Sequence, residues 1–245
     1  MSLNFKDKTI IVTGGTRGIG NTIAEAFYKN GGKVIITGTK NPNNPTLADV
    51  KKRMKYFQLN MLSNQSVENF IKKIKALDKI DVLVNNAGIN KIDTVYDISI
   101  KDWEHINKVN LAAPFLITKE VSKKMVTKKQ GRIVNISSIF GVISKGKRAA
   151  YSSSKWGLIG LTKAVAIDLA PFNIQVNAIS PGFVDTDLTR RILNKQEINA
   201  LRKSIPQGRL AHTQEIADLV IFLSGDNNTY ITGQNIVIDG GYTIV

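Results

Sequence analysis

The sequence contains no cysteine and only two histidines, His105 and His212, which lie far apart in the chain. Without cysteine, disulfides, thiolate nucleophiles and cysteine-ligated iron–sulfur clusters are excluded. Two separated histidines also argue against a zinc site, because such sites need several ligands close together. We therefore expect no metal, and any redox chemistry would require an organic cofactor.

Long apolar runs are also missing, and the first ten residues, MSLNFKDKTI, already carry charges. This pattern predicts neither a signal peptide nor a membrane span, so we expect no membrane partner and a cytoplasmic location. The 245 residues contain no internal repeat, low-complexity stretch or linker, and 42% of them are hydrophobic. We therefore expect residues 1–245 to form one well-packed domain.

Acidic residues are scarce: 19 Asp and Glu against 34 Lys and Arg give a formal net charge of +15. Such an excess suits a nucleic-acid-binding protein. The basic clusters fall on segments with helical periodicity, however, so solvated outer faces explain them better, and we expect no nucleic-acid partner. A basic surface would still attract nucleotides, acyl thioesters or an acidic carrier protein. The clusters are Lys51, Lys52 and Arg53; Lys72, Lys73 and Lys75; and Lys123, Lys124, Lys128 and Lys129.

Short runs of β-branched apolar residues alternate with longer segments of helical periodicity along the chain. This alternation predicts an α/β fold, a Rossmann-type doubly wound parallel sheet of seven strands with helices on both faces. The predicted strands are Thr9–Thr13, Lys33–Thr37, Tyr56–Asn60, Asp81–Asn85, Arg132–Ser137, Ile174–Ser180 and Asn235–Asp239. The predicted helices are Ile19–Lys29, Ser66–Leu77, Lys101–Met125, Ser152–Leu169 and Gln214–Leu223. The long region without a strand, Asp185–Pro206, is expected to form a lid or a pair of substrate helices.

The first predicted strand runs into a glycine-rich turn, Thr13 to Gly20 (TGGTRGIG), at the start of a helix. Glycines let the backbone turn tightly and approach a pyrophosphate, whose charge the free N–H groups of the new helix stabilise. The spacing differs from G-x-G-x-x-G, and a tight strand-to-helix connection alone would also use glycines. After the second strand, Thr37-Gly38-Thr39-Lys40 offers no carboxylate to repel a 2′-phosphate. With Arg17 available from the turn, we expect NADP(H) rather than NAD.

Tyr151 and Lys155 are four residues apart at the start of a predicted helix, so their side chains share one face. A free phenol has a pKa near 10, and a nearby ammonium lowers it by favouring the phenolate, so the pair could act as a general acid. The same spacing also occurs in ordinary pairs on a helix surface. Ser138 follows a predicted buried strand, which would place its hydroxyl at the carboxyl edge of the sheet, where ligands bind in open α/β folds.

Taken together, these residues resemble the short-chain dehydrogenase/reductase family. The glycine turn is similar to that family's T-G-x-x-x-G-x-G, Asn85–Gly88 to its N-N-A-G, and Pro181-Gly182 with Thr186 to its nicotinamide-side P-G motif. The residues similar to its catalytic tetrad are Asn110, Ser138, Tyr151 and Lys155. The matches occur in order and span nearly the whole chain.

The resemblance implies a role for each matching residue. Ser138 would hydrogen-bond a substrate carbonyl, Tyr151 would donate the proton, and Asn110 would support a water that reprotonates Lys155. The implied cofactor-binding residues are Gly14, Thr16, Arg17, Gly18, Ile19 and Gly20 at the phosphates, Thr39 near the 2′-phosphate, Asn60 and Met61 at the adenine, Asn86, Ala87 and Gly88 at the adjoining ribose, Tyr151 and Lys155 at the nicotinamide ribose, and Val184 and Thr186 at the nicotinamide. Homotetramers built on paired long helices are the family habit, so Lys101–Met125 and Ser152–Leu169 are candidate interface helices.

Within the family, the chain is most similar to bacterial 3-oxoacyl-[acyl-carrier-protein] reductases. The likeness is carried by Pro181–Asp187, by Gly208–Leu210 with Gln214–Ala217, and by Tyr230–Gly233 with Asp239–Gly241. It implies an NADPH-dependent oxidoreductase of fatty acid biosynthesis that acts on CH–OH groups, with acyl carrier protein as a partner.

One departure bears on that partner. Lys129 occupies one of the basic positions expected near the active-site entrance, but Phe172 stands where another is expected. A sugar, polyol or other secondary-alcohol dehydrogenase therefore stays open as an alternative, and so does a non-catalytic NADP-binding sensor, which would have no need of a complete tetrad.

Overall fold

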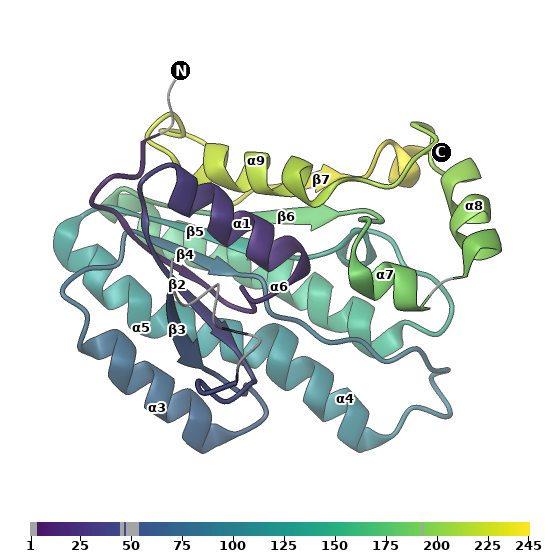
Figure 1. The fold of residues 1–245 in the computed structure, drawn as a ribbon, viewed down its shortest axis with the longest axis horizontal. Helices are drawn as coiled ribbons and strands as arrows, with labels where there is room; N and C mark the ends of the chain where they lie inside the picture. The colour runs from purple at the N-terminus through teal and green to yellow at the C-terminus, as the bar shows by residue number, and fades with distance from the viewer. Residues whose placement is uncertain (1–3, 45–46, 48–53, 193) are drawn as a thin grey trace.

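Seven strands form one parallel sheet in the order β3-β2-β1-β4-β5-β6-β7 (Figure 1). The computed structural model describes residues 4–44, 47, 54–192 and 194–245. The strands are β1 (Thr9–Val12), β2 (Lys33–Gly38), β3 (Lys55–Gln58), β4 (Val82–Asn85), β5 (Gly131–Ile136), β6 (Ile174–Pro181) and β7 (Asn235–Ile238). All seven predicted strands are confirmed, with ends that differ by a residue or two.

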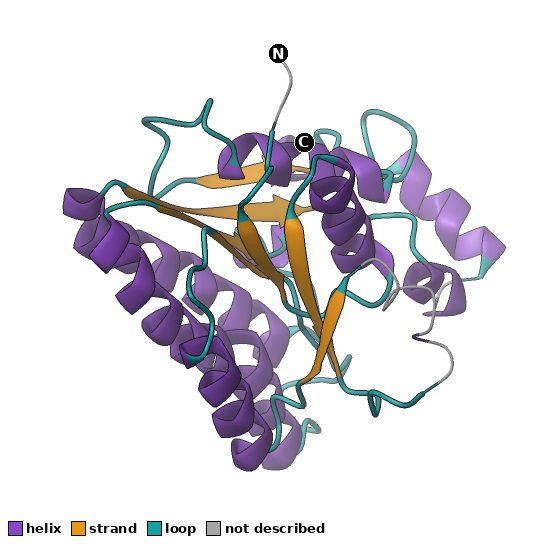
Figure 2. Cartoon of the chain, turned by 60° about the vertical axis from the view of Figure 1, so that its left-hand side comes forward, coloured by secondary structure: helices purple, strands orange, loops and turns teal. Residues whose placement is uncertain are grey.

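Helices cover both faces of the sheet (Figure 2). One face carries α1 (Gly18–Lys29) and α9 (Thr213–Ser224), and the other carries α3 (Asn64–Lys75), α5 (Ala113–Lys128) and α6 (Ala149–Leu169). Further helices are α4 (Ile100–Asn107), α7 (Asp187–Ile192) and α8 (Lys195–Lys203), and short 3-10 turns are η3 (Ile139–Gly141), η4 (Ala170–Phe172) and η5 (Tyr242–Ile244). The doubly wound prediction is therefore confirmed.

The two hydrophobic cores follow from the alternation of side chains along each strand. In β1, Ile10 and Val12 pack with α1 and α9, whereas Ile11 between them packs against the α3, α5 and α6 face. All three are fully buried. Burying an Ile or Val side chain stabilises the fold by about 1.5–3 kcal/mol, which is why both faces of these strands are apolar.

The predicted helix Lys101–Met125 is interrupted. Residues Lys108–Ala112 form a π-helical turn, η2, between α4 and α5, and α5 continues to Lys128. Periodicity alone did not reveal this change, because the apolar pattern runs on through the turn. Such turns often lie at functional sites.

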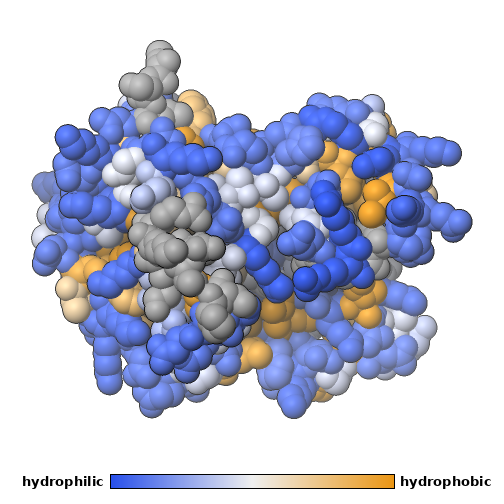
Figure 3. All heavy atoms as spheres, viewed as in Figure 1, coloured by the Kyte–Doolittle hydropathy of each residue, from blue (hydrophilic) through white to orange (hydrophobic). Residues whose placement is uncertain are grey.

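The basic residues of the second and third clusters are exposed on or next to α3 and α5, which agrees with the solvated-face interpretation, except that Lys124 is half-buried and donates to the Lys75 and Leu77 carbonyls. Lys51, Lys52 and Arg53 lie outside the described residues. Figure 3 shows a largely hydrophilic face with smaller hydrophobic areas. Within the described ranges, no helix combines the length and apolar character needed to cross a bilayer.

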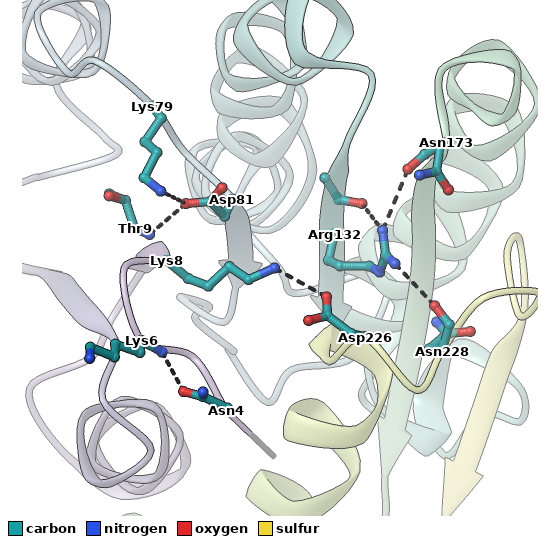
Figure 4. Close-up of polar contacts among 11 residues, drawn as sticks. Asn4, Lys6, Lys8, Thr9, Lys79, Asp81, Arg132, Asn173, Asp226 and Asn228 are labelled. Atoms are coloured by element: carbon teal, nitrogen blue, oxygen red, sulfur yellow. Dashed lines mark hydrogen bonds and ion pairs between the residues drawn. The ribbon is translucent and has the colours of Figure 1, made fainter. Parts of the chain in front are cut away.

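The amino edge of the sheet is closed by polar contacts (Figure 4). The Asp81 carboxylate accepts a hydrogen bond from the Thr9 N–H at 2.7 Å, and Lys8 pairs with Asp226 at 3.1 Å. The buried Arg132 guanidinium donates to the carbonyls of Gly131, Asn173 and Asn228. The carboxyl edge is built differently. Because β3 and β4 lie on opposite sides of β1, the strand order reverses beyond the carboxyl ends of β1 and β4. Open α/β sheets bind their ligands in a crevice at such a reversal.

Candidate active site

The glycine turn leaves β1 at the carboxyl edge and enters α1. Gly14 and Gly18 have left-handed backbones, with φ of 65° and 54°. The Gly14 N–H donates to the Thr37 hydroxyl at 3.2 Å, which ties the turn to β2. A Cβ added to Gly20 would lie 2.3 Å from the Gly14 carbonyl oxygen, so this turn closes only with glycine at position 20.

The segment after β4 packs directly against this turn. The Thr13 hydroxyl accepts hydrogen bonds from the N–H groups of Asn86 and Ala87, at 3.0 and 3.1 Å. In return, the Asn86 amide donates to the carbonyls of Thr13 and Gly14. The two sequence motifs are therefore hydrogen-bonded to each other at the carboxyl edge of the sheet.

This edge fits a dinucleotide phosphate. The first turn of α1 carries no acidic side chain, and Arg17, which precedes the helix, is exposed. Thr39 is exposed just beyond the end of β2. A Cβ on Gly18 would lie 3.9 Å from the Thr186 methyl group, so the loop after β6 faces the turn. Open N–H groups and the helix dipole favour a bound anion here.

Two of the predicted cofactor residues turn their side chains inward. Met61 is 5% exposed and Val184 is 6% exposed, and each belongs to a hydrophobic core. Either residue could therefore meet a cofactor only through its backbone. Asn60 is exposed, and its side chain accepts a hydrogen bond from the Leu62 N–H at 3.1 Å.

Ser138, Tyr151 and Lys155 meet at the carboxyl end of β5. Helix α6 begins at Ala149, which places Tyr151 in its first turn and Lys155 one turn later. The Ser138 hydroxyl lies close enough to the Tyr151 hydroxyl to lower its pKa. The Lys155 ammonium donates to the Ile136 carbonyl at 2.8 Å and lies 5.7 Å from the centre of the Tyr151 ring. Sequence reasoning placed these three side chains together, and the geometry agrees.

The electrostatics of the pair differ from the sequence expectation. Burial raises the pKa of Tyr151, and this effect exceeds the opposing effects of the Ser138 hydrogen bond and the Arg148 charge. Burial also lowers the pKa of Lys155 to about 8. The pKa of Tyr151 is therefore raised, whereas the sequence led to the expectation that Lys155 lowers it. Tyr151 holds its proton at neutral pH, which is the state that a proton donor needs.

Asn110 lies in the π-helical turn and is fully buried. Its side chain accepts a hydrogen bond from the Ile89 N–H at 2.9 Å and donates to the Ile89 carbonyl and the Ser154 hydroxyl. A Cβ on Gly88 would lie 3.3 Å from the Asn110 side-chain oxygen and 3.5 Å from the Lys155 ammonium. Asn110 therefore stands beside Lys155, as the resemblance implied.

Buried side-chain hydrogen bonds connect strands β4 and β5 to helices α5 and α6. The Asn85 amide donates to Thr118 on α5 and to Asn135 on β5, and the Asn135 amide donates to Thr162 on α6. These contacts fix the two helices against β4 and β5. They therefore also fix the catalytic side chains that α6 carries.

Sequence reasoning missed several residues of the site. Thr13 organises the Asn86 segment, Ser154 holds Asn110, and Arg148 and Phe140 flank Tyr151. The sequence pointed to these residues only in that each lies within a few positions of a predicted site residue. No three His, Asp or Glu side chains of the described chain are grouped to ligate a metal.

The structure places Lys129 and Phe172 away from the catalytic residues of their own chain. Lys129 and Phe172 directly precede β5 and β6, so they lie at the amino edge of the sheet, opposite the catalytic residues of the same chain. Sequence position could not show this, because it depends on strand direction. The region Asp185–Pro206 does form a helix pair, α7 and α8, and Asp185 pairs with Arg190 at 2.8 Å.

The chain is similar to known proteins in sequence and in fold. Residues 14–243 match a family model described as Enoyl-(Acyl carrier protein) reductase. The chain is 41% identical to the 3-oxoacyl-[acyl-carrier-protein] reductase of Aquifex aeolicus, over 98% of this chain and 99% of that protein. It is 38% identical to the enzyme of that name from Escherichia coli, over 99% and 100%. A gluconate 5-dehydrogenase from Burkholderia cenocepacia, solved in complex with NADP and tartrate, superposes with a TM-score of 0.91 at 28% identity, over 100% of this chain and 98% of that one.

Proposed function

The chain belongs to the short-chain dehydrogenase/reductase family, and we propose that it reduces the ketone of a 3-oxoacyl thioester to a secondary alcohol with NADPH. The observation that carries this proposal is the contact of the Tyr151 and Ser138 hydroxyls beside Lys155, at the same sheet edge as the glycine turn. A non-catalytic sensor would need none of these proton-transfer contacts.

The cofactor proposal rests on the fit of the glycine turn to phosphates and on the relatives. NADPH, when bound, supplies the hydride. The turn, with Arg17 and Thr39, would hold the phosphates, and no acidic residue follows β2 to repel a 2′-phosphate. The gluconate 5-dehydrogenase with the same fold was solved with NADP.

The side chains then divide the work. Ser138 would hydrogen-bond the substrate carbonyl oxygen and fix it beside the Tyr151 hydroxyl. Tyr151 would transfer its proton to that oxygen as negative charge develops. Lys155, next to the ring, would stabilise the phenolate that remains. Asn110 would keep the π-helical turn and the Ile89 segment in place around Lys155.

The substrate class is supported by two relatives, both named 3-oxoacyl-[acyl-carrier-protein] reductases. The net charge of +15 would also favour an acidic carrier protein as a partner. Neither Lys129 nor Phe172 lies at this chain's own crevice, so the docking residues for such a carrier would be others or would come from a neighbouring subunit. A sugar or polyol dehydrogenase is the second candidate, favoured by the likeness to the gluconate enzyme.

Assembly and location complete the proposal. Exposed aromatic and aliphatic residues on α4, α5 and α6 suit the homotetramer that the family resemblance implies, and the uninterrupted sheet suits a single domain over residues 1–245. The cysteine-free composition suits a cytoplasmic enzyme.

A substrate panel tests the function. Purified protein is mixed with NADPH or NADH and with an acetoacetyl thioester, gluconate's 5-keto derivative or a simple ketone, and loss of reduced-cofactor absorbance is followed. We expect the fastest turnover with NADPH and the thioester. Preference for the keto sugar acid would favour the second candidate, and no turnover with any ketone would contradict catalysis.

A further inference from the structure

Arg148 stands next to the proton donor and has no acidic partner among the residues that the structure describes. It is the residue before α6, three positions before Tyr151. Its guanidinium lies over the Phe140 ring, 5.7 Å from the ring centre, and that ring lies 6.4 Å from the Tyr151 ring. Phe140 in turn follows Ser138 by two residues and donates its backbone N–H to the Ser138 hydroxyl. Phe140 therefore connects Arg148 to both Tyr151 and Ser138.

The hydrogen-bonding capacity of this guanidinium is largely unused. Its Nε is buried and has no partner among the described residues, and Nη1 makes one long bond, 3.3 Å, to the Lys147 carbonyl. No Asp or Glu within the described part of the chain forms an ion pair with it. A buried N–H such as that of Nε is costly to leave unpaired, and an oxygen acceptor on a ligand would satisfy it.

The local charge pattern points the same way. A cation at the N-terminus of a helix opposes the helix dipole, and the first turn of α6 contains no acidic residue that would offset it. Lys145 and Lys147 in the same loop add to the positive charge. A cation placed at a helix N-terminus at a cost in stability is often retained because it has a function.

We propose that Arg148 is a specificity-determining residue that hydrogen-bonds an oxygen on the group next to the reacting ketone. This inference rests on the proposed function and narrows its substrate class to ketones with a neighbouring oxygen acceptor, either the thioester carbonyl of a 3-oxoacyl chain or the carboxylate of a 3-oxo acid. A planar guanidinium can offer two parallel donors to either group. A simple ketone offers nothing to this side chain.

The test compares three substrates of similar size: the acetoacetyl thioester of N-acetylcysteamine, acetoacetate, and 2-pentanone. For each, kcat/KM is measured with NADPH for wild type, Arg148→Gln, Arg148→Lys and the control Lys145→Gln. The ratio of interest is kcat/KM for the thioester or for acetoacetate divided by kcat/KM for 2-pentanone. We expect this ratio to fall about tenfold or more in R148Q for at least one of the two. R148K keeps the positive charge but not the two parallel N–H donors, so its ratio should lie between those of wild type and R148Q. Lys145, an exposed lysine of the same loop, should leave the ratio as in wild type. Thermal melting and NADPH binding show whether each variant is folded.

The outcomes separate the sources and the hypotheses. A fall confined to the thioester assigns Arg148 to the thioester carbonyl, and a fall confined to acetoacetate assigns it to a carboxylate. An equal fall for all three substrates would overturn the proposal, because Arg148 would then act on Tyr151 rather than on substrate. An unchanged ratio would overturn it as well. If wild type reduces none of the three substrates, both the proposed function and this inference are wrong. If wild type is active and R148Q leaves the kcat/KM ratios unchanged, only this inference is wrong.

Discussion

The Tyr151 hydroxyl keeps its proton at neutral pH because burial raises its pKa, and Ser138 lies close enough to oppose that shift. Removing only the hydroxyl should therefore remove proton transfer and leave the fold intact. We expect Tyr151→Phe to lower kcat by about 10²–10⁴-fold, the usual contribution of a general acid. NADPH binding, measured by fluorescence titration, should persist.

Ser153 supplies the control for this experiment. It lies on the same helix two residues later, but it is exposed and its hydroxyl donates to the Ala149 carbonyl. Ser153→Ala should keep normal turnover. Full activity in Y151F would remove Tyr151 from its assigned role.

Lys155 links the site to stability. Burial lowers its pKa from an ordinary value of 10.5 to about 8. Between about pH 8 and 9.5 the unfolded chain therefore holds more protons at this side chain than the folded chain, and the free energy of unfolding rises with pH. The rise approaches about 1.4 kcal/mol per pH unit at most. The range stays below the pH at which tyrosines titrate.

Urea unfolding at several pH values measures this effect. Lys155→Met should show a flatter dependence of the unfolding free energy on pH than wild type, because the titrating group is gone. Lys163→Met, which replaces an exposed lysine of the same helix, should keep the wild-type slope. Equal slopes in K155M and wild type would mean that Lys155 is not desolvated in the folded protein.

At the scale of the elements, the glycine turn is the most exacting piece of backbone. A Cβ at Gly20 would lie 2.3 Å from the Gly14 oxygen and 2.4 Å from the Asn86 amide nitrogen. Moving either atom away would cost free energy, because the Asn86 amide is hydrogen-bonded to the Thr13 and Gly14 carbonyls of the turn. We expect Gly20→Ala to lower the melting temperature by several degrees, for a loss of about 1–3 kcal/mol, and to weaken NADPH binding.

Gly146 is the matched control. A Cβ there would meet nothing within 4 Å, so Gly146→Ala should leave the melting temperature nearly unchanged. Thermal unfolding with and without NADPH reports both effects. Equal melting temperatures for G20A and G146A would contradict the prediction, because they would show that the backbone of the turn can shift to accommodate a methyl group at position 20.

The elements also show where sequence reasoning reached its limit. Short apolar runs predicted all seven strands, and the signal was clearest for β1, β4, β5 and β6, which are buried on both faces. Spacing brought Tyr151 and Lys155 together, because residues four apart share a helix face. The π-helical turn, the inward side chain of Met61 and the place of Lys129 at the amino edge depend on contacts between distant segments. The unused guanidinium of Arg148 depends on such contacts too.

At the scale of the whole molecule, the fold leaves apolar surface without a partner inside the chain. Exposed large side chains gather on α4, α5 and α6; among them Trp103 is 40% exposed, Phe115 46% and Trp156 52%. A groove lined by Trp103, Leu111, Phe115 and Leu161 runs between these helices. Apolar patches rimmed by polar residues mark interaction sites. A second open surface lies at the other end of the sheet, where β7 is half-buried and Val245 is exposed.

Two separate self-complementary surfaces are what a tetramer with perpendicular twofold axes requires. Light scattering of the wild-type protein should therefore give a mass four times the 27.0 kDa of one chain. Phe115→Lys places a charge in the groove and should halve that mass, since only the surface around β7 would remain. Tyr28→Lys changes a side chain of similar exposure, 40%, on α1 at the opposite face and should leave the tetramer whole. A wild-type monomer, or a tetramer that survives F115K, would mean that the helical groove serves something other than self-association.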